Sequence, residues 1–361
     1  MFVEYQGVPN KRSLRVNRSG VAEREKALHG TELMVTNLKL DAPDALLKIV
    51  EHVKENYTEL APQPRRGRPR TFSAQAFLLL AVVGVVLRTF KPQELCTLLA
   101  KDGSLRERLG FSRVPHRRTV ERRLDATLPE AEAQVSALGQ QILAEVIPAA
   151  DEPQASAIDG RMYQAQGPLW HKRDRAQGRI PARLRNVDTE SAWSKSGYRG
   201  WVHGYRLVLQ GLVFPVPVPL FARWCPNSVG ESSVLTQALA TAQLPVTGLL
   251  LGDSTFGGAD LIALYAQHGG WLLTPQQLPP PDSWQQDLYA YRRETIELLF
   301  QRIVQACDLK VCPAKGLART GTFVIASVWL YQVLFLDNHR HHRPVARIKE
   351  IIDEGRWRIA A

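Results

Sequence analysis

Three acidic residues, Asp159, Asp253 and Glu297, occupy positions from which they could support metal-dependent chemistry. Each aspartate follows a short apolar run, and Glu297 lies within a helical pattern at 289–307. The carboxyl ends of strands in an α/β sheet form one functional edge, which a crossing helix can also reach. Carboxylates brought together there raise one another's pKa unless a cation neutralises them. The pattern therefore predicts a site for Mg²⁺, which prefers oxygen ligands.

The chemistry expected of such a site is phosphoryl transfer. Two Mg²⁺ ions about 3.5–4 Å apart stabilise both the attacking and the leaving oxygen of an in-line displacement, and we expect Mn²⁺ to substitute. A simpler interpretation stays open, because a chain with 35 acidic residues contains many accidental groups of three. In that interpretation Asp159 and Asp253 cap turns, and Glu297 pairs with Arg293 on the same helix face.

The elements that must position the three carboxylates alternate between strands and helices after residue 153. Apolar runs bounded by turn residues predict strands at 155–158, 204–212, 213–224, 246–251 and 270–273. Helical periodicity predicts helices at 231–243, 258–268, 289–307 and 322–336. The first strand is expected to end at Asp159. This order predicts an α/β fold with a mixed five-stranded sheet and flanking helices.

The preceding residues, from 73 to about 148, show helical patterns throughout, in short helices separated by tight turns. The helix expected at 117–126 carries four basic residues: Arg117, Arg118, Arg122 and Arg123. Short helices of this kind suit a helix-turn-helix-like domain that binds DNA. The same arginines would also suit a solvated helix face.

Two further basic segments favour nucleic acid as the partner. Between Arg161 and Arg206, ten Lys or Arg residues stand against three Asp or Glu, with Trp and Tyr residues interleaved, and Lys172 and Arg173 belong to this segment. Basic groups neutralise phosphates, and aromatic rings stack on splayed bases. The second segment is a Pro/Gly/Arg linker that contains Arg65, Arg66, Arg68 and Arg70. Its Arg-Gly-Arg-Pro core could lie in an A·T-rich minor groove, although a plain basic linker explains it equally well.

Composition excludes several other classes. The 361 residues carry a net charge of +11 with 45% apolar residues, as expected of a folded protein with a polyanionic partner. The longest apolar run, 76–87, is too short to span a membrane, and the first 30 residues lack the apolar core of a secretory signal. The four cysteines show no zinc or disulfide spacing. We expect a cytoplasmic, nucleoid-associated protein without a membrane partner.

Four motifs occur in order along the chain. They are Ala-Ile-Asp-Gly at 157–160, Gly-Trp-Val-His-Gly-Tyr-Arg-Leu at 200–207, Leu-Leu-Leu-Gly-Asp-Ser-Thr-Phe at 249–256 and Tyr-Arg-Arg-Glu-Thr-Ile-Glu-Leu-Leu-Phe at 291–300. Together they resemble the DDE transposases of bacterial insertion sequences, in the group with a Tyr-Arg-Glu-Lys signature. The resemblance spans roughly residues 64 to 336 and implies a catalytic domain with the RNase H-like fold.

The resemblance implies specific roles. Asp159, Asp253 and Glu297 would be the catalytic, metal-binding residues. The helix of the last motif would hold DNA near the scissile phosphate through Tyr291, Arg292 and Arg293. The chain departs from the signature at two positions, because Ala290 stands at the tyrosine position and Val304 at the lysine position. These departures bear on cleavage rate and end processing more than on the acidic residues.

The function implied by the resemblance is cleavage and strand transfer of double-stranded DNA, with terminal inverted repeats bound by the N-terminal domain and a homodimer joining two element ends. We divide the chain into a poorly ordered segment (1–40), a helical DNA-binding domain (41–150), the catalytic domain (151–338) and a basic C-terminal tail or helix (339–361). One alternative is a catalytically decayed copy that only binds DNA. A serine esterase based on Gly-Asp-Ser at 252–254 is disfavoured, because no Asp-x-x-His follows it.

Overall fold

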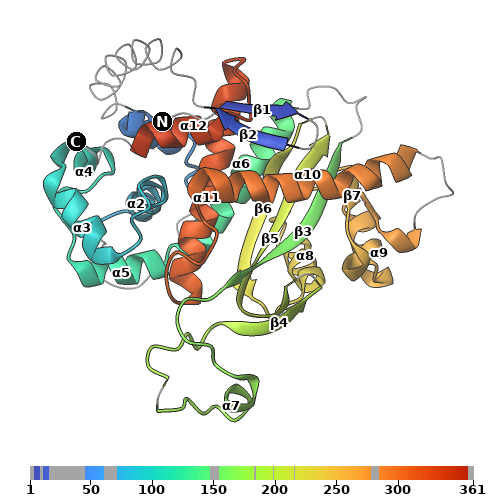
Figure 1. Ribbon diagram of the computed structural model, residues 1–361, viewed down its shortest axis with the longest axis horizontal. Helices are drawn as coiled ribbons and strands as arrows, with labels where there is room; N and C mark the ends of the chain where they lie inside the picture. Colours follow the sequence, from blue (N-terminus) through green and yellow to red (C-terminus); the bar gives the residue numbers. More distant parts are fainter. Residues whose placement is uncertain are drawn as a thin grey trace.

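The structure is a computed structural model. It describes residues 4–8, 11–15, 45–60, 71–146, 154–182, 184–197, 199–214, 216–277 and 284–356 (Figure 1). The linker arginines 65, 66, 68 and 70 lie outside the described residues. Near the N-terminus, β1 (Glu4–Val8) and β2 (Lys11–Arg15) pair as an antiparallel hairpin that the sequence analysis did not anticipate.

A mixed sheet forms the centre of the part of the chain that follows residue 153. Its strands are β3 (Ala155–Gln164), β4 (Ala192–Ser196), β5 (Gly200–Phe214), β6 (Val218–Pro226), β7 (Leu249–Leu251) and β8 (Trp271–Leu273). The order across the sheet is β6-β5-β3-β7-β8, and β4 pairs with the start of β5. β3 runs antiparallel to β5 and parallel to β7. This order and these directions define the RNase H-like fold, which confirms the predicted mixed sheet. Within the described residues the sheet has six strands rather than the predicted five, because β4 also pairs with β5.

The predicted end of the first strand is wrong. β3 does not stop at Asp159 but continues to Gln164, because β5 pairs with it along its whole length, as far as Gln164 and Gly204. The residues beyond Asp159 include Gly, Arg and Gln and lack the apolar pattern of a buried strand. Backbone pairing with a long neighbour, rather than side-chain burial, therefore extends this strand.

The helices form two layers around the sheet and a separate group beside it. In chain order the structure has a helix at residues 45–55, then α2 (Ala74–Val86), α3 (Pro92–Lys101), α4 (Gly103–Arg108), α5 (Arg117–Asp125), α6 (Leu128–Val146), α7 (Lys172–Ala176), α8 (Glu231–Ala240), α9 (Ala259–Gln267), α10 (Trp284–Cys307), α11 (Leu317–Arg340) and α12 (Ile348–Arg356), with 3₁₀ turns at Ser254–Phe256 and Pro275–Gln277.

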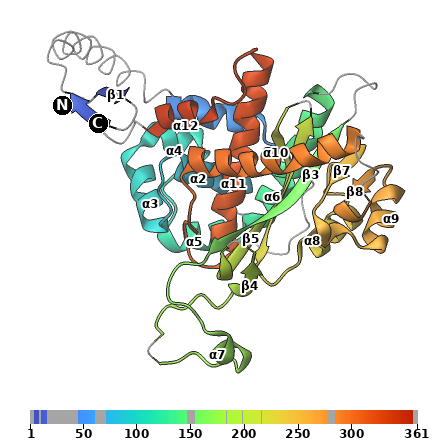
Figure 2. The same ribbon diagram turned by 45° about the vertical axis from the view of Figure 1, so that its right-hand side comes forward.

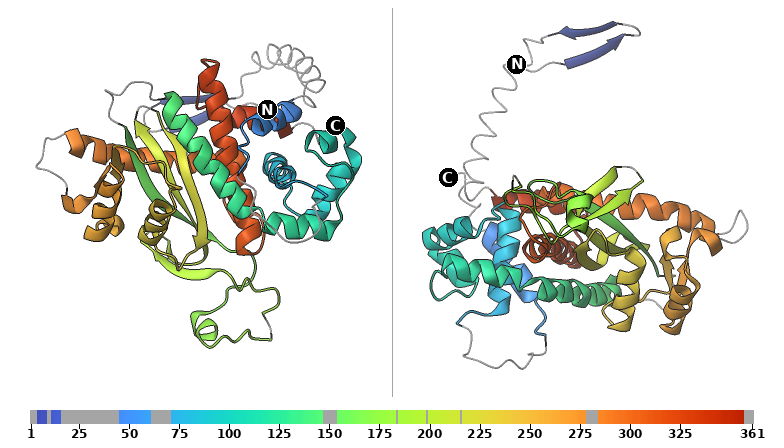
Figure 3. Two further views of the ribbon diagram at one scale, coloured as in Figure 1. Left: turned by 180° about the vertical axis from the view of Figure 1, so that it is seen from behind. Right: turned by 90° about the horizontal axis from the view of Figure 1, so that it is seen from below.

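The alternation of side chains along the strands creates two cores. Ile158, Val208 and Leu250 pack with apolar residues of α8 and α9 on one face of the sheet. Their strand neighbours, among them Ala157 and Leu251, face the other core, to which α6, α10 and α11 contribute (Figures 1 and 3). Period-two alternation of this kind is what a sheet covered on both faces requires.

Helix α11 lies at the centre of the larger core. It contacts α2, α5, α6, α10 and β6, and every residue from 320 to 338 is buried. By length and composition it could cross a membrane, but 94% of its most apolar window is buried inside the protein. Its hydropathy is therefore that of a core helix.

The helical group shares this core with the sheet. Glu132 of α6 pairs with Arg223 of β6, with Oε2 and Nη1 2.6 Å apart, and also accepts a hydrogen bond from the backbone N–H of Trp224. At Gly139 the helix touches β6, because a Cβ there would lie 1.9 Å from the carbonyl oxygen of Leu220. The N-terminal helices and the sheet are thus packed against each other, although the chain changes from helices to strands near residue 150. The region predicted as a basic tail contains α12, whose Ile348 and Ile352 are buried.

A long connection between β3 and β4 projects from the body of the protein and carries α7 (Figures 1 and 2). At its base, His203 of β5 is 2% exposed, its Nε2 lies 3.0 Å from the hydroxyl of Ser191, and its ring packs on Trp193. Burial lowers the pKa of His203 below its usual 6.5, and the charge of Arg175 lowers it further. The imidazole is therefore neutral in the folded protein at neutral pH.

This lowered pKa predicts a loss of stability in mild acid. Unfolded chains bind the histidine proton more tightly than the folded protein, so the free energy of unfolding falls as the pH drops below about 6.5. Urea denaturation at about pH 7.5 and pH 5.5 should show a contribution on the order of 1 kcal/mol that His203→Gln removes. An identical pH dependence in both proteins would contradict the assignment.

Candidate active site

Strand register brings Asp159 and Asp253 to the same level of the sheet. β3 and β7 are parallel neighbours, with Ala157 opposite Leu251. Each aspartate follows two residues later, so both lie on the same face by the period-two alternation of strands. The two apolar runs therefore end at one edge of the sheet. Asp253 also caps the following 3₁₀ turn, accepting a hydrogen bond from the N–H of Thr255 at 2.8 Å.

The third carboxylate that the structure places with them is Glu231, which the sequence analysis missed. Oxygen atoms of Asp159, Glu231 and Asp253 all lie within 4.8 Å of one another. Glu231 is the first residue of α8, which follows β6. Since β6 and β3 are both antiparallel to β5, β6 ends at the same edge as β3. A Cβ on Gly160 would lie 2.3 Å from Oε1 of Glu231, so glycine provides the space for this carboxylate.

The electrostatics of this acidic cluster, defined as Asp159, Glu231 and Asp253, oppose full ionisation. Burial raises the pKa of Glu231 to about 7, against the attraction of Arg206, whose Nη1 lies 3.1 Å from Oε1. Burial also raises the pKa of Asp159, although the N–H of Gly160 donates to its carboxylate at 2.8 Å. The neighbouring carboxylates raise both pKa values further. A divalent cation would relieve this repulsion.

Glu297 lies on the exposed side of α10 and outside the acidic cluster. Its Oε1 is 2.9 Å from Nε of Arg293, and its side chain is 58% exposed. This ion pair is the one expected from the simpler interpretation, in which Glu297 has no metal. The helix nevertheless passes close enough to the cluster for its charges to act there. Arg292 lowers the pKa of Asp159 and Glu297 raises it. The structure thus brings two of the three predicted catalytic residues together and leaves the third beside them.

Tyr289 anchors α10 over the edge of the sheet. Its hydroxyl donates to the carbonyl oxygen of Gly252 at 3.1 Å, and the guanidinium of Arg292 lies over its ring. The two departures from the family signature have different surroundings, since Ala290 is exposed whereas Val304 is 5% exposed within the core. A lysine at position 304 would therefore need a different surrounding from the one found here.

The remaining predicted DNA contacts are distributed over three surfaces. On α5, Arg117, Arg118 and Arg122 are exposed, but Arg123 is buried and its guanidinium lies 5.0 Å from the centre of the Phe77 ring. Lys172 and Arg173 of α7 are exposed, and on α10 Tyr291 is 50% exposed. Lys172 also lies over the ring of Trp201, which is 56% exposed.

The donor set of the acidic cluster fits a hard divalent cation. All three ligands are carboxylate oxygens, and within the described part of the chain no histidine or cysteine joins them. Oxygen-only sets of this kind suit Mg²⁺ or Mn²⁺ rather than zinc. Each of the three residues is partly buried, so the cluster retains some access to solvent at the edge of the sheet.

Comparison with protein-family models and with curated protein sequences gave no match. Among solved structures, a synaptic complex of the piggyBac transposase with hairpin DNA is similar over 87% of this chain and 78% of that chain, with 11% identity and a TM-score of 0.38. A paired-end complex of the Mos1 transposase with its left transposon end is similar over 69% of this chain and 81% of that chain, with 10% identity and a TM-score of 0.21. At these TM-scores the likeness assigns no activity, and the RNase H-like fold is assigned from the strand order of the sheet itself.

Proposed function

We propose that this protein is a DNA transposase that cleaves and joins DNA strands with two divalent cations. The observation that carries the proposal is the placement of Asp159, Asp253 and Glu231 within 4.8 Å at one edge of an RNase H-like sheet. The ordered motifs of the sequence support the same function, because they surround two of these three residues. The substrates would be the ends of the element that encodes the protein and a target duplex.

In this proposal Asp159, Glu231 and Asp253 hold one Mg²⁺ ion, and Glu297 supplies a ligand for a second. When bound, the ions lower the pKa of a water nucleophile and stabilise the charge on the reacting phosphate. Arg292 and Arg293 would hold the DNA backbone beside the cluster, because guanidinium groups bind phosphate oxygens in a fixed geometry. Arg206 keeps Glu231 at the cluster through its ion pair.

Exposed basic residues outside the acidic cluster would hold the remaining DNA. We propose that Lys172 and Arg173 of α7 contact the backbone, and that the N-terminal helices bind the terminal repeats. Cleavage at two ends requires two active sites to be held together, so we propose a homodimer on DNA. The site of action would be the nucleoid in the cytoplasm.

A copy that binds DNA without cutting it is the second candidate. The observations that favour it are the pairing of Glu297 with Arg293 and the residues Ala290 and Val304 at signature positions. Two of the three carboxylates of the family motif remain in a common site, which favours an active enzyme.

The test uses labelled DNA that ends in the inverted repeats flanking the gene, incubated with the protein in Mg²⁺, Mn²⁺ or EDTA. Cleavage at the repeat boundary that requires the metal is the expected result. A protein that shifts this DNA in a gel but leaves it uncut with both metals would support the second candidate instead.

A further inference from the structure

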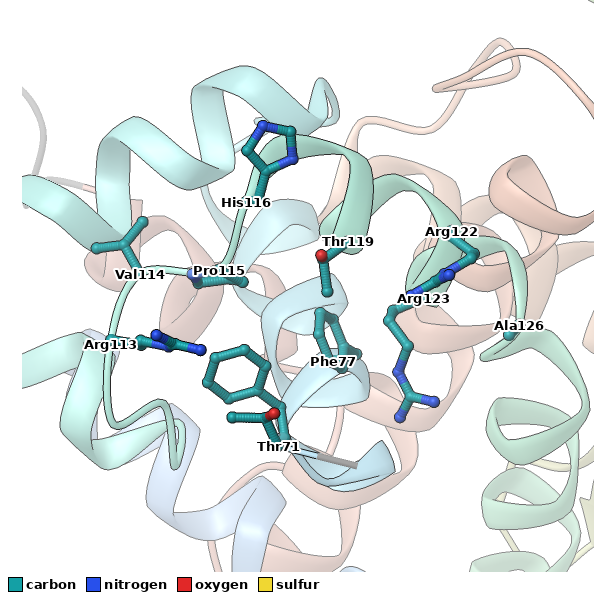
Figure 4. A pocket seen from close by; sticks show the side chains of 11 residues that line it. Thr71, Phe77, Arg113, Val114, Pro115, His116, Thr119, Arg122, Arg123 and Ala126 are labelled. Atoms are coloured by element: carbon teal, nitrogen blue, oxygen red, sulfur yellow. The ribbon is translucent and has the colours of Figure 1, made fainter. Parts of the chain in front are cut away.

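A pocket of about 890 Å³ lies among the short N-terminal helices, and none of the acidic cluster residues lines it. Its walls are Thr71, Phe72 and Phe77 around the start of α2, residues 113–116 before α5, and α5 with the residue that follows it (Figure 4). Figure 4 shows Arg113 on one side of the pocket and Arg122 and Arg123 on the other, with Phe77 between them. None of the residues that line this pocket has a role in the proposed cleavage reaction.

The charge of the pocket is of one sign. Three arginines, His116 and the hydroxyl groups of two threonines line it, and among the described lining residues none is acidic. Arg123 is 9% exposed, and its guanidinium lies 5.0 Å from the centre of the Phe77 ring. That ring in turn packs edge-on against Phe111. One cation is therefore held in place by packing, while Arg113 and Arg122 are exposed and can adjust to a ligand.

Two helices begin at this pocket and add to its positive potential. Ser73 caps α2, and His116 caps α5. Neither helix has an acidic residue in its first turn, so the partial positive charge of each N-terminus is uncompensated by its own sequence. The arginines and both helix termini thus favour an anion at the same place.

We propose that this pocket binds the phosphodiester backbone of a DNA strand. The inference rests on the proposed function in taking DNA as the substrate, and it names where and how the N-terminal helices hold it. Arg113 and Arg122 donate to phosphate oxygens from opposite walls, and Arg123 supplies fixed positive charge behind them. The half-buried ring of Phe72, which also lines the pocket, offers an apolar contact to a sugar.

This mode of binding differs from the base reading expected of a helix-turn-helix. Arginines that point into a pocket hold the backbone, which has the same charge in every sequence. Arg117 and Arg118 do not line the pocket and remain available for contacts outside it. Loss of a pocket arginine should therefore weaken binding to all duplexes alike.

The experiment measures fluorescence anisotropy of two labelled duplexes of unrelated mixed sequence in EDTA, which removes catalysis from the readout. The 361-residue protein is compared with Arg113→Ala, Arg122→Ala and the control Arg347→Ala. The control changes an exposed arginine just before α12, which packs near the opposite end of α2, where Nε of Arg356 donates to the carbonyl of Val86. Arg123 is left unchanged because it packs in the core.

Each pocket variant should lose about tenfold in affinity for both duplexes, and the salt dependence should become shallower by about 0.9 for each lost phosphate contact. The control should bind as the wild type does. Unchanged affinity in both pocket variants, or a loss confined to one duplex, would overturn the proposal. Thermal stabilisation of wild type but not Arg122→Ala by deoxyadenosine monophosphate, with duplex binding equal in the two, would assign the pocket to free nucleotides instead. Failure of the proposed transposase activity would appear separately, as wild-type protein that binds both duplexes but never cleaves.

Discussion

Asp253→Asn is expected to reduce metal-dependent DNA cleavage by about a thousandfold or more while leaving the protein folded. The substitution removes a charged ligand from the acidic cluster, and a neutral amide binds Mg²⁺ more weakly than a carboxylate. It preserves the cap of the 3₁₀ turn, because the asparagine oxygen can still accept from the N–H of Thr255. The measurement is single-turnover cleavage of end-labelled DNA, with thermal melting recorded on the same preparation.

The matched control for this experiment is Asp260→Asn, which neutralises an exposed aspartate in the first turn of α9. It carries the same change of charge close by in the sequence, outside the cluster, so cleavage should stay near the wild-type rate. Equal activity of Asp253→Asn and this control would remove the acidic cluster from the mechanism.

Two further variants separate the roles of the other carboxylates. Glu297→Gln should lose cleavage but still bind one Mn²⁺ ion, because Asp159, Glu231 and Asp253 remain. Glu231→Gln should lose both cleavage and the ion held by the acidic cluster, since Glu231 belongs to that cluster. Titration of free Mn²⁺ by electron paramagnetic resonance measures the number bound. Full Mn²⁺ binding by Glu231→Gln would show that Glu231 serves only as the partner of Arg206.

Gly139→Ala is expected to destabilise the protein by about 3 kcal/mol. The added Cβ would lie 1.9 Å from the carbonyl oxygen of Leu220, and this neighbour is backbone within β6, which cannot rotate away. Helix α6 would have to move off the sheet and disturb the ion pair between Glu132 and Arg223. Because that pair is largely buried, loosening it adds to the loss. Urea unfolding followed by circular dichroism measures the effect.

Gly103→Ala provides the comparison for this substitution. Gly103 begins α4, and a Cβ there would meet no atom closer than 3.6 Å, at the end of the Arg106 side chain. Its free energy of unfolding should change by less than about 1 kcal/mol. Similar stability of the two variants would mean that α6 can shift along β6 without loss.

The sequence predicted those parts of the site that depend on local pattern. Asp159 and Asp253 each follow an apolar run, and parallel pairing of these runs brings the two side chains together. Glu231 escaped prediction because its position depends on the direction of β6 and on the space left by Gly160, neither of which is local. The helix of Glu297 was predicted, but the side of α10 that faces the sheet is decided by packing.

The burial of Arg123 is a different case, since the sequence does contain a signal for it. Val120, Arg123 and Leu124 occupy one face of α5 by the spacing of three and four residues, and all three are buried. The four arginines alone indicate one basic surface. Reading the apolar positions of the same helix first would have separated the buried arginine from the three exposed ones.

The central position of α11 has a mechanical consequence. Within the described residues, α11 packs against α2 and α5 as well as against β6, so the N-terminal helices and the sheet share one core. The distance between the N-terminal helices and the acidic cluster is then fixed by the fold. DNA held by the N-terminal helices would be cut at a constant distance along the duplex, and a shift in that distance would require bending of the DNA rather than rearrangement of the protein.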